Sequence, residues 1–157
     1  KGVPMGSSLG AAPGGKAPTF LIAAMKDPTS GNLDRVQVIK GWIDAQGKSR
    51  EQVYDVVWGD AQRRQPDADG VVPPVGNTVD AATATWTNTI GDAQLTAVWT
   101  DPDFDPAQRA FYYARVLEIP TPRWTTYEAV RNNLPLLPDV PATIQERAWS
   151  SPIWYTP

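Results

Sequence analysis

Two residue types that carry much of enzyme chemistry are missing from this sequence of 157 residues, which contains no histidine and no cysteine. Without histidine there is no imidazole general base and therefore no Ser-His-Asp triad. Zinc sites of the usual kinds, which are built from His and Cys, are excluded as well. The absence of cysteine also excludes disulfides and thiolate chemistry, but it does not fix the compartment, because many periplasmic proteins lack cysteine.

Long apolar segments and an excess of basic charge are also missing. No stretch approaches the roughly 20 apolar residues that a membrane-spanning helix needs. The net charge is −3 and the pI is about 4.8, and there is no basic stripe, so nucleic acid is not expected as a partner. Since the sequence begins at Lys1 with no signal segment, we interpret it as a processed product or a fragment of a longer protein.

Proline, glycine and tryptophan are the abundant residue types. Sixteen Pro and twelve Gly predict many turns and irregular segments rather than helices. The length suits one domain with one sizeable core. Seven Trp predict a Trp-rich core with some partly exposed rings, because Trp is rarely buried in full.

Alternating apolar residues predict a chain of short strands. Val36, Val38 and Trp42 share one face of their segment, and Ile39 and Ile43 lie on the other. The short turn that follows predicts a hairpin with the next strand. The first strand is predicted to be buried on both faces, with a short helix as the alternative. The expected strands are 20–26, 33–44, 51–59, 78–87, 93–100, 109–119 and 150–157.

The segment 109–124 is expected to form the centre of the fold. Its front half has apolar residues on both faces and predicts a central strand, whereas Pro120 and Pro122 end that strand. A short helix is expected at 125–132, capped by Thr125 with Glu128 at capping-box spacing. We therefore expect truncation after Glu118 to unfold the domain.

These elements predict a mainly β fold. The number of short strands favours an antiparallel β-sandwich with immunoglobulin- or fibronectin-like pairing, a short helix and an extended Pro-rich C-terminal wrap. The expected organisation is one domain in three parts: a Gly/Pro-rich arm or linker at 1–18, the sandwich core at 19–124 and the wrap at 125–157.

Acidic residues provide the candidate metal ligands. Asp101, Asp103 and Asp105 alternate like the start of a calcium loop, but the sixth and twelfth positions hold Pro106 and Tyr112 instead of Gly and an acid. A turn whose Asp side chains bond to the local backbone is therefore favoured. We expect no cofactor.

Arginines among aromatic residues provide the candidate ligand site. Arg115, Arg123 and Trp124 are the residues we assign to it, because guanidinium groups bind anions and stack on rings. Structural stacking and ion pairing are the favoured alternative for these arginines. Glu118 and Glu128 would suit glycoside hydrolysis only if the fold brought them together. We expect no catalytic residue in the chain.

The tryptophans leave a second ligand hypothesis open. An exposed row of two or three of them would indicate a carbohydrate-binding face. Four lie within strand patterns, where burial in the core is the simpler explanation: Trp42, Trp58, Trp86 and Trp99.

Six segments carry a resemblance to a known family: Gly2–Gly6, 32–42, 80–91, 105–124, 145–148 and 151–155. Together they resemble the C-terminal part of a large bacterial family of unknown function, usually exported, whose members carry an upstream PHP-type (polymerase and histidinol phosphatase) metallohydrolase-like domain. The resemblance covers nearly the whole chain. Metal ions in such proteins are held by the upstream domain, and this chain has no His, so no metal ligand carries over.

The resemblance implies a non-catalytic accessory β-sandwich domain of an exported metal-dependent hydrolase, whose partner is the upstream catalytic domain. It also implies a periplasmic or otherwise exported location. The alternative is a β-sandwich module that binds carbohydrate or another small ligand. A third hypothesis, a small acid/base enzyme, would need two carboxylates facing each other in one cleft.

Overall fold

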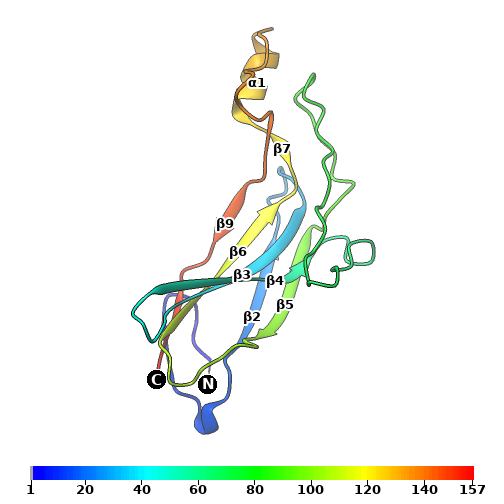
Figure 1. The fold of residues 1–157 in the computed structure, drawn as a ribbon. Coiled ribbons are helices and arrows are strands. Elements are labelled where there is room, and N and C mark those ends of the chain that lie inside the picture. Colours follow the sequence, from blue (N-terminus) through cyan, green and yellow to red (C-terminus); the bar gives the residue numbers. More distant parts are fainter. Residues whose placement is uncertain (1) are drawn as a thin grey trace.

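The computed structural model describes residues 2–157, so Lys1, the first residue of the expected arm, lies outside them. The fold is mainly β and contains several sheets (Figure 1). The largest has six strands, with the order β1-β10-β6-β3-β4 and β9 also paired with β6. Their bounds are Ser8–Gly10 (β1), Leu33–Ile43 (β3), Ser49–Trp58 (β4), Ala110–Glu118 (β6), Arg147–Trp149 (β9) and Ile153–Thr156 (β10).

The centre of this sheet agrees with the sequence-based expectation. Strands β3 and β4 form the expected antiparallel hairpin, with a β-bulge between Val36 and Gln37. Strand β6 pairs with β3 along one edge and with both β9 and β10 along the other. The segment 109–124 therefore supplies the central strand, as its apolar residues on both faces predict. Strand β1, within the expected arm, pairs in parallel with β10.

A second, two-stranded sheet packs over one face of the main sheet. It consists of β2 (Thr19–Met25) and β5 (Gln94–Thr100), which are antiparallel. The core between the two sheets includes Val38, Leu95 and Tyr112, all of which are buried. The expectation that β2 is buried on both faces is wrong, because Leu21 and Met25 are 76% and 78% exposed. Only one face of β2 meets the main sheet.

The expected strand at 78–87 is wrong. This segment is made of turns with a single bridge between Asp80 and Thr85. Side chains satisfy the backbone locally: Asp80 Oδ1 accepts a hydrogen bond from the Ala82 amide, and Thr78 donates to the Thr87 carbonyl. Short polar side chains thus compete with a strand ladder, and alternating Thr alone did not reveal this competition.

A second projecting segment, residues 121–144, is called the arm from here on and is distinct from the expected N-terminal arm at 1–18. It carries the only α-helix among residues 2–157, away from the sheets (Figure 1). Its stalk is the pair β7 (Thr121–Pro122) and β8 (Thr143–Ile144), and α1 spans Trp124–Arg131. The expected cap is wrong, since the N-cap is Arg123 and makes no side-chain cap bond. A short 3-10 turn at Pro13–Gly15 completes the elements.

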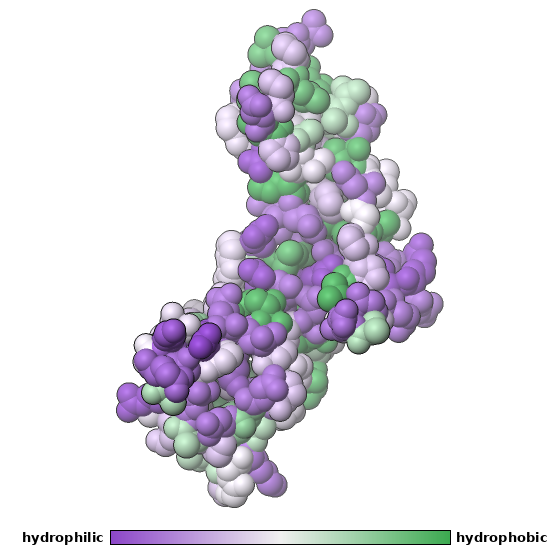
Figure 2. All heavy atoms as spheres, viewed as in Figure 1, coloured by the Kyte–Doolittle hydropathy of each residue, from purple (hydrophilic) through white to green (hydrophobic). Residues whose placement is uncertain are grey.

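Hydrophobic residues on the surface are concentrated in one part of the molecule. Figure 2 shows hydrophobic residues gathered on the upper lobe, which contains the arm. The exposed apolar side chains of the arm include Trp124, Leu134 and Leu137. No helix among residues 2–157 has both the length and the apolar character needed to cross a membrane.

Candidate functional site

A buried ion pair ties one loop to the inner face of the main sheet. Lys40 Nζ lies 2.6 Å from Asp101 Oδ2, and the two side chains are only 3% and 0% exposed. Lys40 also donates to the Asp103 carbonyl, and Tyr112 Oη donates to Asp101 Oδ2 at 2.7 Å. Each charge thus has a partner and further hydrogen bonds, as buried charges require.

The tyrosines of this cluster are held in the neutral form. Burial, followed by the hydrogen bond to Asp101, raises the pKa of Tyr112 far above its ordinary value. Burial and the hydrogen bond to Asp103 raise the pKa of Tyr54 in the same direction. Both hydroxyls therefore act as donors to carboxylates at neutral pH, and neither is a base.

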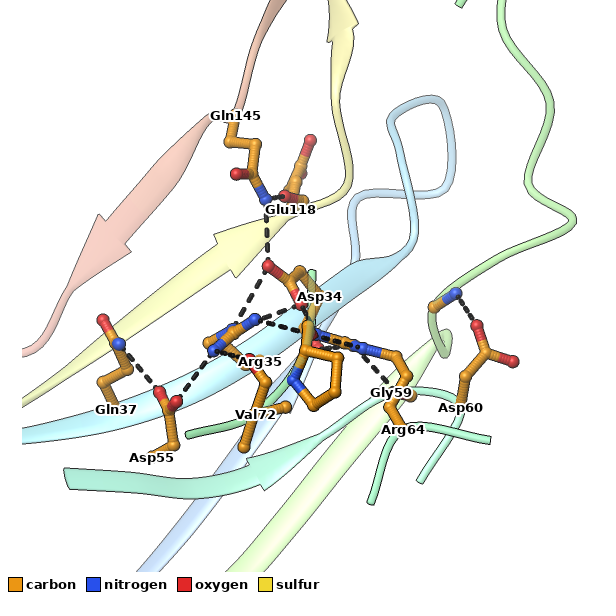
Figure 3. A network of polar contacts seen from close by, with 12 residues as sticks. Asp34, Arg35, Gln37, Asp55, Gly59, Asp60, Arg64, Val72, Glu118 and Gln145 are labelled. Atoms are coloured by element: carbon orange, nitrogen blue, oxygen red, sulfur yellow. Dashed lines mark hydrogen bonds and ion pairs between the residues drawn. The ribbon is translucent and has the colours of Figure 1, made fainter. Parts of the chain in front are cut away.

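A second polar network lies where β3 meets the loop 59–75 (Figure 3). Arg64 Nη2 lies 2.6 Å from Asp34 Oδ1, and both side chains are nearly buried. Arg64 also donates to the carbonyls of Gly59 and Pro73. Arg35 connects Asp34 to Asp55, which it meets at 2.7 Å. Arg64 therefore anchors the loop through polar contacts, and Val72 and Val75 of the same loop are buried as well.

The C-terminal segment joins the same network. Gln145 Nε2 donates to Asp34 Oδ2 at 3.0 Å and to the Glu118 carbonyl at 2.9 Å (Figure 3). The Glu118 carboxylate accepts a hydrogen bond from the Ser30 hydroxyl. The network therefore links β3, the end of β6 and the segment leading to β9. Its charges pair with one another and do not face a cavity together.

The other face of the main sheet carries aromatic side chains. Register places Glu51, Gly41, Phe111 and Trp154 side by side on neighbouring strands. Because side chains alternate along strands, directly paired residues share a face. A Cβ at position 41 would clash with the Phe111 ring, so glycine there lets the ring lie across β3. Trp154 is half exposed, and its ring centroid lies 5.3 Å from that of Phe111.

The aromatic face continues along β6. Tyr113 stacks on Phe111 with centroids 6.3 Å apart and planes 9° apart. Arg115 follows on the same face, where its Nε donates to Gln37. Trp149 of β9 pairs with Arg115 in register and is 57% exposed.

A groove of about 590 Å³ lies at the Phe111 end of this face. It is lined by aromatic residues and by three charged residues, Arg50, Glu51 and Arg109. Arg50 forms an ion pair with Asp44, which leaves Glu51 and Arg109. Neither the Glu51 nor the Arg109 side chain forms a hydrogen bond or ion pair with the part of the chain that the structure describes. This groove therefore combines ring faces with a free acceptor and a free donor.

A larger groove, of about 910 Å³, opens between the two sheets. It is lined by β2, the N-terminal residues Gly2–Met5 and the segment 146–151. Strand β2 pairs only with β5, so its other edge borders this groove unpaired among residues 2–157.

The residues assigned to a ligand site from the sequence occupy two separate places. Arg115 lies in the main sheet beside Gln37. Arg123 and Trp124 lie at the start of the arm, where the Trp124 ring is 67% exposed. The Arg123 Nε is enclosed and has no hydrogen-bond partner among residues 2–157. The structure therefore does not bring these three residues into one site.

The carboxylates of the Asp101–Asp105 loop are each bound by protein groups. Asp101 is paired with Lys40, Asp103 accepts from Tyr54 Oη, and Asp105 accepts from the Ala107 amide. Within residues 2–157, no three His, Cys, Asp or Glu side chains group in a way that could hold a metal ion.

The proposed carboxylate pair is likewise split between elements. Glu118 belongs to β6 and bonds to Ser30, whereas Glu128 is exposed on α1 in the arm.

Sequence reasoning missed Glu51 as a partner of the aromatic row, whereas Arg109 is one of the arginines that the sequence places among aromatic residues. Side-chain alternation puts Phe111 and Tyr113 on the same face of β6, but no sequence signal specifies which strand lies beside them. The close approach of Gly41 to Phe111 was equally hidden, since it depends on the register of β3 and β6.

Comparison with curated proteins and with solved structures gives no match. A family model, described as a protein of unknown function (DUF3604), matches residues 1–157. Since this match covers the whole sequence, the chain belongs to the DUF3604 family.

Proposed function

We propose that this chain is a non-catalytic accessory domain of a longer, exported protein, and that the longer protein is a metal-dependent hydrolase with a PHP-type catalytic part. The resemblance of the sequence to such proteins supports the proposal. The absence, within residues 2–157, of a group of acidic side chains that could hold a metal ion supports the non-catalytic role for metal-dependent hydrolysis.

Exposed apolar residues on the outer face of the β2–β5 sheet carry the proposal. Leu21 and Val98 are directly paired in register and are 76% and 73% exposed. Met25, on the same face, is 78% exposed. An apolar patch of this kind marks an interaction surface, and its occupant in the proposal is the catalytic part of the same protein.

The fold proposal is more specific than the mainly β architecture. The two-layer packing of the β2–β5 sheet on the main sheet supports a sandwich of the immunoglobulin or fibronectin type. The proposed periplasmic or otherwise exported location rests on the resemblance alone, and cell fractionation with an antibody against this chain would test it.

An activity comparison tests the accessory role. The chain and the longer protein would be assayed with p-nitrophenyl phosphate and p-nitrophenyl acetate in the presence of Mn²⁺, Mg²⁺ or Zn²⁺. We expect turnover only from the longer protein. Turnover by the isolated chain that EDTA abolishes would overturn the proposal.

The docking surface has its own test. The double variant L21T/V98T should lower the melting temperature or activity of the longer protein while leaving the isolated chain as stable as wild type. The matched control is Val71→Thr, since Val71 is 59% exposed in a loop away from this face. Equal effects of the two variants on the longer protein would count against docking through the β2–β5 sheet.

A second candidate function is a module that binds carbohydrate or another small ligand. It is favoured by one observation: Trp149 and Trp154 are both exposed and both lie on the aromatic face of the main sheet.

A further inference from the structure

We infer that the row Glu51–Gly41–Phe111–Trp154 is a binding site for the sugar rings of a neutral polysaccharide. This inference rests on the second candidate function and gives it a location and a ligand class. The row is fixed by register, because Gly41 pairs with both Glu51 and Phe111, and Phe111 pairs with Trp154.

The rings provide the apolar part of the site. Phe111 crosses β3 above Gly41, stacks with Tyr113 and meets the half-exposed Trp154. A pyranose ring has flat faces made of C–H groups, and such faces pack on aromatic rings. Glycine at position 41 allows the Phe111 ring to lie close to the sheet, since any side chain at this position would displace the ring.

The charged residues provide the polar part. Glu51 supplies acceptors and Arg109 supplies donors at the same groove of about 590 Å³. A ligand with many hydroxyl groups satisfies both, whereas a purely apolar ligand would bury the two charges without partners. A few polar groups around an apolar floor are typical of small-ligand sites.

Charge favours a neutral ligand. The groove presents one acid and one base among its unpaired side chains, and the protein carries a net charge of −3. A polyanion such as nucleic acid would be repelled overall, because such binding depends on neutralising phosphates with Lys and Arg.

The face is long enough for more than one sugar ring. Trp149 pairs with Arg115 and Trp154 pairs with Phe111, so the two rings stand four positions apart along β6. At strand spacing this separation is about 13 Å. The polar side chains of Gln37 and Arg115 lie on the same face at the Trp149 end.

Affinity electrophoresis tests the inference with the intact chain. Xylan, mixed-linkage β-glucan and galactomannan would be the neutral probes, and polygalacturonate the acidic one. Calorimetry with xylohexaose and cellohexaose would then give the affinity for a bound sugar. We expect retardation by at least one neutral polysaccharide.

Three variants locate the site. Trp154→Ala should weaken binding about tenfold, the equivalent of one aromatic stacking contact, and Trp154→Phe should restore part of it. Glu51→Gln, at an exposed position, should weaken binding severalfold without affecting folding. The matched control is Trp124→Ala, which removes an exposed ring of the arm and should bind like wild type. Near-ultraviolet circular dichroism would check that each variant is folded.

The outcomes separate the site from the function. If wild type binds none of the probes, both the inference and the carbohydrate-binding function are overturned. If neutral polysaccharide binding survives both Trp154→Ala and Glu51→Gln, the function stands and the site is wrong. Binding of polygalacturonate alone would overturn the neutral ligand class.

Discussion

At the scale of single residues, the ion pairs of this fold differ in how far they are buried. Lys40 and Asp101 are both buried, and each also bonds to a third group. Asp44 and Arg50 form an ion pair of similar length, 2.8 Å, but the Arg50 side chain is 53% exposed. The two pairs therefore form a matched comparison of buried and exposed charge.

Lys40→Met is expected to lower the free energy of unfolding by about 3 kcal/mol, because it leaves the buried Asp101 carboxylate without its cation. Arg50→Ala should cost less than about 1 kcal/mol, since solvent screens the exposed pair. Urea unfolding followed by Trp fluorescence would measure both. Similar losses in the two variants would mean that burial of the Lys40–Asp101 pair does not matter.

Tyr112 predicts a specific dependence of stability on pH. Tyr112→Phe removes a hydrogen bond to a buried carboxylate and should destabilise the protein by about 1.5–3 kcal/mol at pH 7. The pKa of Tyr112 is raised in the folded state, so above about pH 10 the folded protein keeps a proton that the unfolded chain loses. The free energy of unfolding of wild type then falls by about 1.4 kcal/mol per pH unit from this residue, and the variant lacks this loss.

The gap between wild type and Tyr112→Phe should therefore narrow as the pH rises above 10. Urea unfolding at pH 8, 10 and 11 would measure it. Other groups that titrate in this range are shared by both proteins and largely cancel in the difference. A gap that stays constant would show that Tyr112 does not keep its proton through this range.

At the scale of elements, the C-terminal segment has two parts with different roles. Strands β9 and β10 pair with β6, and Tyr155 is part of the buried core. The arm between them and β6 forms its own two-stranded stalk and packs few buried side chains, among them Thr126 and Ala129.

Truncation after Glu118 should therefore unfold the protein, whereas replacing residues 125–141 with a short Gly-Ser linker should not. A short linker is sufficient, because Arg123 N lies 2.9 Å from the Ala142 carbonyl oxygen and the two strands of the stalk therefore meet at this point. Thermal unfolding followed by circular dichroism distinguishes the two. A cooperatively folded truncation would show that β9 and β10 are dispensable.

The whole molecule is elongated, with the sheets at one end and the arm at the other (Figures 1 and 2). Many of its exposed apolar residues lie on the outer β2–β5 face and on the arm, and Trp149 and Trp154 are exposed on the aromatic face of the main sheet. This distribution underlies both proposed functions.

Limited proteolysis should cut the arm and leave the molecule assembled. Chymotrypsin is expected to cleave after Leu136, in the exposed segment that follows α1. The C-terminal fragment should remain bound, because β9 and β10 stay hydrogen-bonded to β6. Denaturing gels would show two fragments and gel filtration a single peak; two separate peaks would contradict the prediction.

The sequence by itself determined most of the strands and excluded much chemistry. Side-chain alternation identified the β3–β4 hairpin and the central strand β6, because period-two patterning is local. The lack of His and Cys excluded the usual triads and zinc sites, because no arrangement of the chain can supply a missing residue type. The resemblance pointed to a family of unknown function, and the match to the DUF3604 model confirms membership in such a family.

Only the tertiary structure decided which residues meet. The bond of Asp34 to Gln145 joins positions far apart in the chain, and the seating of Phe111 on Gly41 depends on register across two strands. Neither leaves a local signature in the sequence. The exposed face of β2 was missed for the same reason: an apolar run records hydrophobicity, whereas burial depends on whether a second layer covers each face.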